Sequence, residues 1–261
     1  MRKIAVAMAK GGVGKTTTAV NLAHGLSLKG RRVLLVDCDT QAQTAKFLGV
    51  SPLYGLYEFV RGCDEAGRPV SRNETLFPAR PNLWLLAGGI KLVELKNWLG
   101  EQPREVRQTL LKETLVPRDG AIDYMIFDCA PGWDVLSVNI LMAAGEVLCP
   151  VALQAPALEG LKTFFGYLMA AQRLNTELEL RYVLPTLFDQ RTRQSLEIYR
   201  KLKRLFQKQI CDPIRTNVRL SEAPAKGQSI FEYQKNATGA VDYARLIRRV
   251  SDDDGRKKGF S

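Results

Sequence analysis

The residue types best suited to chemistry lie near the start of the chain, where residues 10–17 read Lys-Gly-Gly-Val-Gly-Lys-Thr-Thr. Glycines let a backbone curl until successive N–H groups point inward at phosphate oxygens. We expect Lys15 to bridge the β- and γ-phosphates of a nucleotide and the Thr16 hydroxyl to ligate Mg²⁺. The common pattern G-x-x-x-x-G-K-T begins with glycine, whereas this chain has Ala9 there, followed by a second lysine, Lys10.

Three carboxylates at the ends of apolar runs could complete a phosphoryl-transfer site. Asp128 ends the run YMIFD, and Asp37 and Asp39 end a second run in VDCDTQ. Ligands of an open parallel sheet bind at the carboxyl ends of its strands. Asp128 is expected to hold Mg²⁺ through water, because phosphoryl transfer needs a hard cation near the phosphates. Either Asp37 or Asp39 would orient the attacking water while the other stays in the outer shell of the metal; helix capping is the alternative for Asp39.

The elements that must position these residues follow from the apolar pattern. The phosphate loop lies between an apolar run at 4–9 and a helical pattern at 16–28, and a second apolar run follows at 32–37, as in a βαβ unit. Continuous apolar strands indicate burial on both faces and therefore a mostly parallel sheet. Further strands are expected at 82–86, 124–128, 146–151 and 180–185, and helices at 136–144, 158–174 and 194–208.

Composition narrows the class of protein. The 261 residues contain no run of 18 apolar residues, so no membrane-spanning helix is expected. The apolar run after the basic start breaks at Lys10, which argues against a secretory signal peptide. A single histidine, His24, excludes a multi-histidine metal site. The five cysteines are widely spaced and contain no Cys-x-x-Cys pair, so we expect reduced, mostly buried thiols.

Five segments together resemble the ParA/Soj partition ATPases, a branch of the deviant-Walker-A ATPases that also include MinD. The segments are residues 10–17, DCDTQ from Asp37, DCAPGWDVLSVN from Asp128, LCPVALQAPALEGL from Leu148 and NVRLSEAPAKGQSI from Asn217. The resemblance covers most of residues 1–250 and is weakest at 51–81, where the irregular composition predicts a variable insertion at the edge of the sheet.

The resemblance implies roles for individual residues. Lys10 corresponds to the family lysine that reaches across an ATP sandwich dimer to the partner's nucleotide, and Lys15 acts within its own subunit. Asp39 corresponds to the water-orienting aspartate, so the implied catalytic residues are Lys10, Lys15 and Asp39. The implied metal set is Thr16, Asp39 and Asp128. Adenine is expected near Pro185, Thr186 and the 214–218 segment. The implied nucleotide-binding residues are Lys10, Gly11, Gly12, Val13, Gly14, Lys15, Thr16, Thr17, Pro185, Thr186 and Asn217.

An excess of cations points to a polyanionic partner. Lysine and arginine number 38 against 27 acids, a net charge of +11, which favours nucleic acid first and an anionic membrane second. Within 191–208 apolar residues recur every three or four positions, which predicts a helix with a buried stripe and a basic opposite face. The candidate DNA contacts are Arg191, Arg193, Arg200, Lys201, Lys203, Arg204, Arg219, Arg245 and Arg248. A solvated helix face without a partner is the alternative.

These observations predict a single-domain α/β P-loop fold over residues 1–250, with a mostly parallel twisted sheet flanked by helices on both faces. A charged, flexible tail is expected over 251–261. The resemblance implies a Mg²⁺-dependent ATPase that forms an ATP-dependent homodimer, binds double-stranded DNA without sequence preference and hydrolyses ATP slowly. A ParB-like or other cargo adaptor would stimulate hydrolysis, and the protein would position a plasmid, chromosome or other large cargo as a cytoplasmic, nucleoid-associated ATPase.

Three other classes of protein are less well supported by the sequence. A MinD-like membrane-surface ATPase is the main alternative, but it needs bulky apolar residues in the tail, where only Phe260 is found; no membrane insertion is therefore expected. An iron-protein-like reductase would need a second cysteine to bridge a cluster together with Cys129. A P-loop ligase fits poorly with Lys10.

Overall fold

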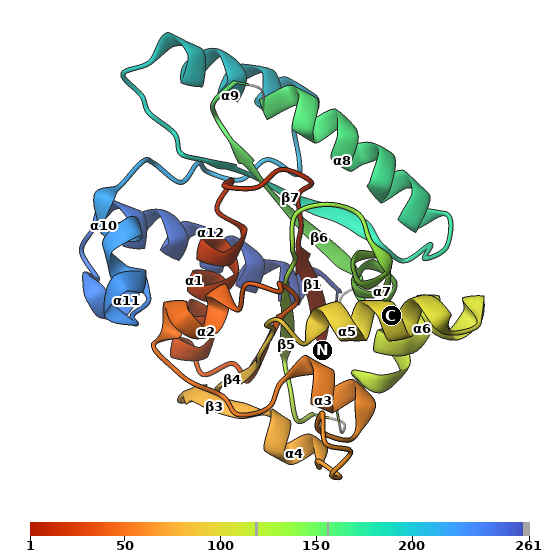
Figure 1. Cartoon of the computed structure of the whole chain (residues 1–261). Coiled ribbons are helices and arrows are strands. Elements are labelled where there is room, and N and C mark those ends of the chain that lie inside the picture. The colour runs from red at the N-terminus through yellow and green to blue at the C-terminus, as the bar shows by residue number, and fades with distance from the viewer. Residues whose placement is uncertain (118–119, 156, 258–261) are drawn as a thin grey trace.

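The computed structural model describes residues 1–117, 120–155 and 157–257, which form a central sheet between two layers of helices (Figure 1). The strand order is β3-β4-β2-β5-β1-β6-β7. All neighbouring strands are parallel except β3 and β4, which are antiparallel. The strands are β1 (Arg2–Val6), β2 (Val33–Asp37), β3 (Phe77–Arg80), β4 (Leu83–Leu86), β5 (Tyr124–Asp128), β6 (Glu146–Ala152) and β7 (Glu179–Thr186).

Helices cover both faces of the sheet, and the strand residues alternate between the two layers. Ile4 and Val6 of β1 pack into one core and Ala5 into the other. The first layer comprises α1 (Lys15–Leu28), α2 (Gln43–Leu48), α11 (Ile230–Tyr233) and α12 (Thr238–Lys257). The second comprises α3 (Leu56–Arg61), α5 (Leu92–Glu101), α6 (Arg104–Thr114), α7 (Val135–Ala143), α8 (Ala157–Gln172) and α9 (Arg193–Leu205). Burial on both faces explains the continuous apolar strands and confirms the predicted α/β class.

The remaining short elements lie at the edges of this core. The stretch 51–81, expected as an insertion at the sheet edge, contains α3, α4 (Arg72–Thr75) and β3. β3 is the edge strand of the sheet, a position that tolerates the proline Pro78 within it. On the other face, α10 (Val218–Glu222) and the 3₁₀ helix η1 (Ala223–Lys226) follow the last strand and pack near α2.

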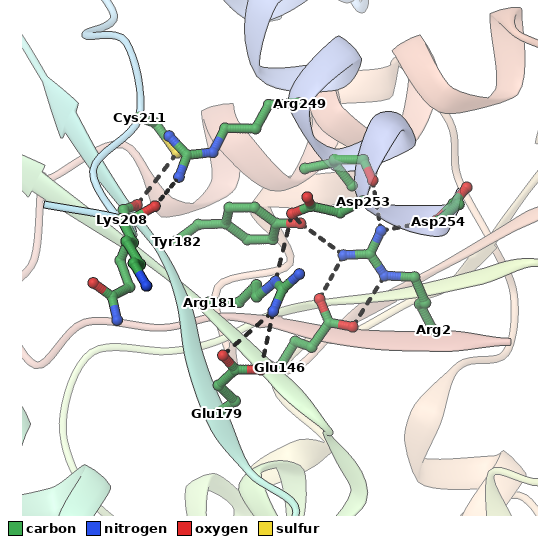
Figure 2. Close-up of polar contacts among 12 residues, drawn as sticks. Arg2, Glu146, Glu179, Arg181, Tyr182, Lys208, Cys211, Arg249, Asp253 and Asp254 are labelled. Carbon is green, nitrogen blue, oxygen red and sulfur yellow. Dashed lines mark hydrogen bonds and ion pairs between the residues drawn. The ribbon is translucent and has the colours of Figure 1, made fainter. Parts of the chain in front are cut away.

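The C-terminal helix extends into the segment that was expected to be a charged, flexible tail. Of residues 251–261, those up to Lys257 continue α12, and the last four lie outside the described part of the chain. Figure 2 shows contacts between this part of α12 and the sheet: the Arg2 guanidinium donates to both carboxylate oxygens of Glu146 and to Asp254 of α12, the last at 2.8 Å. The charged C-terminal segment suggests that its acids are solvated. Asp254 instead pairs with Arg2 of β1, whose side chain is largely buried.

The state of the cysteines and the length and polarity of the helices agree with what the composition predicts. All five cysteines are free thiols, and four of them, Cys38, Cys129, Cys149 and Cys211, are buried. Burial raises the pKa of the Cys211 thiol to about 12, so it stays protonated. In the ranges that the structure describes, no helix has the length and apolar character needed to cross a membrane.

Candidate nucleotide site and basic surface

The phosphate loop connects β1 to α1 and is shaped by glycine conformations. Gly12 and Gly14 have φ values of +72° and +87°, which side-chain-bearing residues rarely adopt. A Cβ added at Gly11, Gly12 or Gly14 would meet no atom of the described chain within 4 Å, so the loop surface is open. Lys15, the first residue of α1, is 7% exposed, and its ammonium donates to the Lys10 carbonyl at 2.9 Å. The loop therefore curls around Lys15 and presents the N-terminus of α1, which favours anions.

A cavity of about 610 Å³ opens in front of this loop, within the range of small-molecule sites. It lies at the carboxyl ends of the central parallel strands, where ligands of open α/β sheets bind. The lining residues come from the loop, from the segments that follow β2 and β5, from α5 and from the end of β7. They are Gly11, Gly12, Gly14, Lys15, Thr16, Thr17, Asp39, Thr40, Gln41, Gln43, Lys96, Ala130, Pro131 and Leu187.

Two carboxylates meet beneath the cavity because the sheet register brings them together. Asp37 of β2 lies opposite Asp128 of β5, and they are 0% and 1% exposed. Asp37 accepts hydrogen bonds from the Asp39 N–H at 2.9 Å and the Thr44 N–H at 3.2 Å. Asp128 Oδ2 accepts from the Thr44 hydroxyl at 3.0 Å. Thr44, in the first turn of α2, thus contacts both acids.

Burial sets the protonation of this pair. It raises the pKa of Asp37 to about 6, and burial together with the neighbouring Asp37 carboxylate raises the pKa of Asp128 to about 7. Two adjacent buried carboxylates disfavour double ionisation. In the nucleotide-free protein near neutral pH, the pair is therefore poised to hold a proton that a cation could replace.

The donor set fits Mg²⁺ that is shared with phosphates. Within the described residues, Oδ1 of Asp128 is buried and has no hydrogen-bond partner, and such an atom calls for a water or ion. The same part of the chain contains no cluster of three or more His, Cys, Asp or Glu side chains that could hold a metal alone. Mg²⁺ is usually bound by one or two carboxylates, water and substrate phosphates. The Thr16 hydroxyl with Asp39 and Asp128 matches that pattern.

Asp39 and Lys10 lie in different places relative to the cavity. Asp39 lines it, is half-buried, and its Oδ1 accepts from the Gln41 N–H at 3.0 Å. Lys10 runs along α8 instead: a Cβ added at Gly160 would lie 3.4 Å from the Lys10 Cβ and 3.7 Å from its Cδ. Among the described residues that line the cavity, Lys10 is absent.

The segments predicted to lie near adenine are adjacent to one another. Thr186 is buried, and its hydroxyl donates to the Val13 carbonyl at 2.9 Å. This bond ties the end of β7 to the backbone of the phosphate loop. The Pro185 carbonyl accepts from the Ile214 N–H at 2.8 Å, which places β7 beside the 214–218 segment. Asn217 caps α10, where its side chain accepts from the N–H two residues on.

Several residues at this site were not predicted from the sequence, and three of them show why: Lys96, Leu187 and Thr44. Lys96 and Leu187 line the cavity, and Thr44 binds the acid pair. Lys96 comes from α5, a helix that the sequence analysis did not assign, and only the fold brings it to the loop. Leu187 directly follows Thr186, so the prediction of Thr186 as a nucleotide-binding residue was the only sequence signal that could have indicated it. Thr44 follows the strand-end acids and carries no motif of its own.

Some of the residues predicted to contact DNA line grooves on the surface, and the others are exposed side chains outside them. Arg200 and Lys203 of α9 and Arg245 of α12 line one groove of about 780 Å³, and Arg245 and Arg248 line a second of about 590 Å³. The other predicted residues are exposed but outside these grooves: Arg191, Arg193, Lys201, Arg204 and Arg219.

Two of these exposed arginines are paired with local acids. Arg191 donates to both oxygens of Asp189 at 3.0 and 2.9 Å although its side chain is 87% exposed. Arg219 pairs with Glu222 at 2.7 Å. Their net positive charge at the surface is therefore smaller than the sequence suggests. In the groove between α9 and α12, Arg245 also lies 3.5 Å from Asp242 and Asp212 is a lining residue, whereas no ion pair of Arg200 or Lys203 is found within the described residues.

Comparison with known proteins agrees with this fold. A protein-family profile described as "AAA domain" matches residues 1–180. The chromosome-partitioning ATPase Soj of Thermus thermophilus is 37% identical over 254 residues, which cover 96% of this chain and 95% of that protein. The sporulation initiation inhibitor protein Soj of Bacillus subtilis is 35% identical, with 95% and 97% covered.

Solved structures show the same architecture. A putative plasmid partition protein of Borrelia burgdorferi bound to AMPPNP has a TM-score of 0.79 at 25% identity, covering 97% of this chain and 99% of that chain. Cobyrinic acid a,c-diamide synthase of Mycobacterium smegmatis with bound ADP and magnesium has a TM-score of 0.80 at 29% identity, with 96% and 94% covered.

The sheet, the glycine-rich loop and the strand-end acids define a P-loop ATPase. Full-length identity to the Soj proteins narrows the class further: the chain belongs to the ParA/Soj family of partition ATPases. The predicted family and ATPase activity are thereby confirmed.

Proposed function

We propose that this chain binds Mg²⁺-ATP, forms a sandwich homodimer in that state, and then binds double-stranded DNA without sequence preference. Slow hydrolysis, stimulated by a ParB-like or other cargo adaptor, returns the monomer. The cycle positions a plasmid, chromosome or other large cargo over the nucleoid in the cytoplasm. One observation carries the proposal: a single α/β core holds both an open phosphate cavity and a separate groove where Arg200, Lys203 and Arg245 converge.

The residues of the cavity divide the chemistry of hydrolysis among them. The backbone of the phosphate loop and Lys15 bind the phosphates, as the open loop and buried ammonium allow. Thr16 and Asp128 hold the cation, which would neutralise the charge that develops on the phosphates. Asp39, at the cavity wall and only half-buried, orients the attacking water.

The position of Lys10 supports its proposed role across the dimer. Its side chain runs along α8 outside the cavity of its own subunit. A second cation delivered to the γ-phosphate of the partner would stabilise charge in the way that a trans-acting arginine does. Lys10→Ala should therefore bind ATPγS but remain monomeric in size-exclusion chromatography, whereas Lys15→Ala should lose nucleotide binding. A Lys10→Ala protein that dimerises like the wild type would contradict the trans role.

Dimerisation explains why DNA binding should depend on ATP. Each monomer presents the groove with Arg200 and Lys203 once, and a dimer presents it twice at high effective concentration. Contacts to phosphates release counterions, so affinity should fall with salt with a slope of about −0.9 per phosphate neutralised. Binding of this kind positions the protein on DNA without reading its sequence.

Filter binding to two unrelated duplexes, with ATPγS, ADP and no nucleotide, tests the proposal. The double variant Arg200→Glu/Lys203→Glu should weaken binding to both duplexes by about tenfold or more while ATPγS-dependent dimerisation stays intact. Lys112→Glu, which reverses one charge at an exposed site on α6, serves as the control for the single variants Arg200→Glu and Lys203→Glu, each of which should also weaken binding to both duplexes. Unchanged affinity of the double variant for both duplexes would show that the groove is merely solvated.

The C-terminal helix does not favour the membrane-surface alternative. Tyr243, Leu246, Ile247 and Val250 of α12 are at most 3% exposed because they pack against the sheet. A helix that binds a bilayer needs such residues free on one face. Within the described length of α12 these side chains are already part of the core.

A further inference from the structure

A lysine side chain from outside the phosphate loop, that of Lys96, lines the nucleotide cavity. Among the described residues that line the cavity, Lys15 and Lys96 are the two lysines, and no arginine takes part. Lys96 lies in the middle of α5, and it lines the cavity together with the residues of the phosphate loop. The site therefore has a second positive charge within the same subunit, whereas Lys10 lies outside the cavity on α8.

The ammonium of Lys96 is held in position before any ligand arrives. It donates to Asp134 Oδ2 at 2.7 Å, and its side chain is 23% exposed. The other oxygen of Asp134 caps α7 by accepting from the Ser137 N–H at 2.8 Å and the Ser137 hydroxyl at 3.0 Å. Burial alone would raise the pKa of Asp134, but the bonds from Lys96 and Ser137 lower it. An ammonium carries three N–H donors, so donors remain for a ligand.

Neighbouring residues place Lys96 at the end of the cavity that would hold the terminal phosphate. Asp39, which follows β2, and Ala130 and Pro131, which follow β5, line the same cavity as Lys96. The turn before α5 is fixed to the same segment, because the Gly89 N–H donates to the Asp39 carbonyl at 3.0 Å. In the sheet, β2 and β5 lie on one side of β1, which leads into the phosphate loop, and β7, whose end is predicted to lie near adenine, is on the other side.

The charges near Lys15 are consistent with this polarity of the cavity. Burial lowers the pKa of Lys15, and the charges of Asp128 and Asp39 oppose that shift, so all three groups lie close together. A lysine that bridges β- and γ-phosphates next to the acids that hold Mg²⁺ marks the terminal-phosphate end. Lys96 shares the cavity wall with Asp39 at that end.

We propose that Lys96 contacts the γ-phosphate and gives the site its preference for ATP over ADP; this inference rests on the proposed nucleotide-binding function. The γ-phosphate carries charge that ADP lacks, and an ammonium already held by Asp134 can donate to it at little entropic cost. The residue therefore discriminates between the two nucleotides rather than supporting nucleotide binding in general.

Calorimetric titration with Mg²⁺-ATPγS and with Mg²⁺-ADP tests this assignment. Lys96→Met should weaken ATPγS binding by about tenfold or more and ADP binding by less than about twofold. Lys96→Arg, which keeps a cation of similar reach, should retain most of the preference for ATPγS. Lys112→Met removes an exposed lysine from the neighbouring helix α6 and should change neither affinity. Thermal unfolding of each variant checks that the fold is intact.

Asp134→Asn tests the positive charge of Lys96 separately from the ion pair that holds its ammonium in position. This variant keeps the ammonium, so its ATPγS affinity should fall less than that of Lys96→Met. Equal weakening of ATPγS and ADP by Lys96→Met, or no weakening of either, would overturn the assignment while leaving the proposed function standing. If the wild type binds neither nucleotide, or if Lys15→Ala binds both normally, the proposed function fails and this inference fails with it.

Discussion

Replacing Asp128 by asparagine should stabilise the nucleotide-free protein at neutral pH while weakening Mg²⁺-dependent nucleotide binding. The side chain is 1% exposed, lies beside the buried carboxyl of Asp37, and has one oxygen without a partner in the described structure. Asparagine keeps the shape and can still accept from the Thr44 hydroxyl, but it carries no charge. The substitution therefore removes the desolvated anion and, with it, the proposed cation ligand.

The size and sign of the effect follow from the pKa. Burial and Asp37 raise the pKa of Asp128 from 3.8 to about 7. A carboxyl that binds its proton more tightly in the folded state destabilises the fold progressively as pH rises from about 4 to about 7. About three pKa units at about 1.4 kcal/mol each give an upper bound of roughly 4 kcal/mol at pH above 7. Because the two acids share the effect, we expect asparagine to recover about 1–3 kcal/mol.

Calorimetric unfolding without nucleotide, from about pH 5 to about pH 8, measures this difference. The melting temperature of Asp128→Asn should exceed that of the wild type by about 2–4 °C per kcal/mol, and the gap should widen as pH rises. Asp123→Asn is the control, because the hydrogen bond from Arg32 lowers the pKa of Asp123 and its loss should destabilise the fold at neutral pH. A gap for Asp128→Asn that is negative, or constant across this pH range, would refute the reasoning.

Three further predictions concern other parts of the molecule. Asp39→Ala should keep the ATP-bound dimer but slow phosphate release by about tenfold or more, about 1.4 kcal/mol of barrier; unchanged turnover would assign water orientation elsewhere. Arg2→Ala should destabilise the protein to urea by about 3–5 kcal/mol, because Glu146 would lose its guanidinium partner in a buried site; a loss below about 1 kcal/mol would contradict this. Gly227→Ala should cost more stability than Gly67→Ala: both have positive φ, but only at Gly227 would the new Cβ meet backbone, at 2.7 Å.

Much of the fold was predictable because its strands are buried on both faces. Continuous apolar runs identified six of the strands, and the elements on either side of the phosphate loop were correct. The missed strand, β3, is short, antiparallel and contains Pro78, so it carries none of the usual strand signals. α5 and α12 were missed although their buried residues do recur at helical spacing, as in Leu92, Leu95 and Leu99.

The site was less predictable where it depends on tertiary contacts. The loop motif fixes the chemistry of Lys15 and Thr16 by local sequence alone. The contact between Asp37 and Asp128, by contrast, requires the register of two strands that are far apart in the chain. Lys96 enters the cavity only because α5 packs across the ends of these strands, and the Arg2 pairing required knowledge of where the last helix ends.

The nucleotide cavity and one of the basic segments are joined through a single short helix. Thr44 binds the acid pair at the start of α2, and the helix ends at Gly49. There the backbone meets Gly227 so closely that a Cβ on Gly227 would lie 2.7 Å from the Gly49 Cα, and Arg80 donates to the carbonyls of Leu48 and Gly227 at 3.0 Å. The end of α2 is therefore packed directly against η1 and its C-cap, while its first turn binds the acid pair beneath the nucleotide cavity.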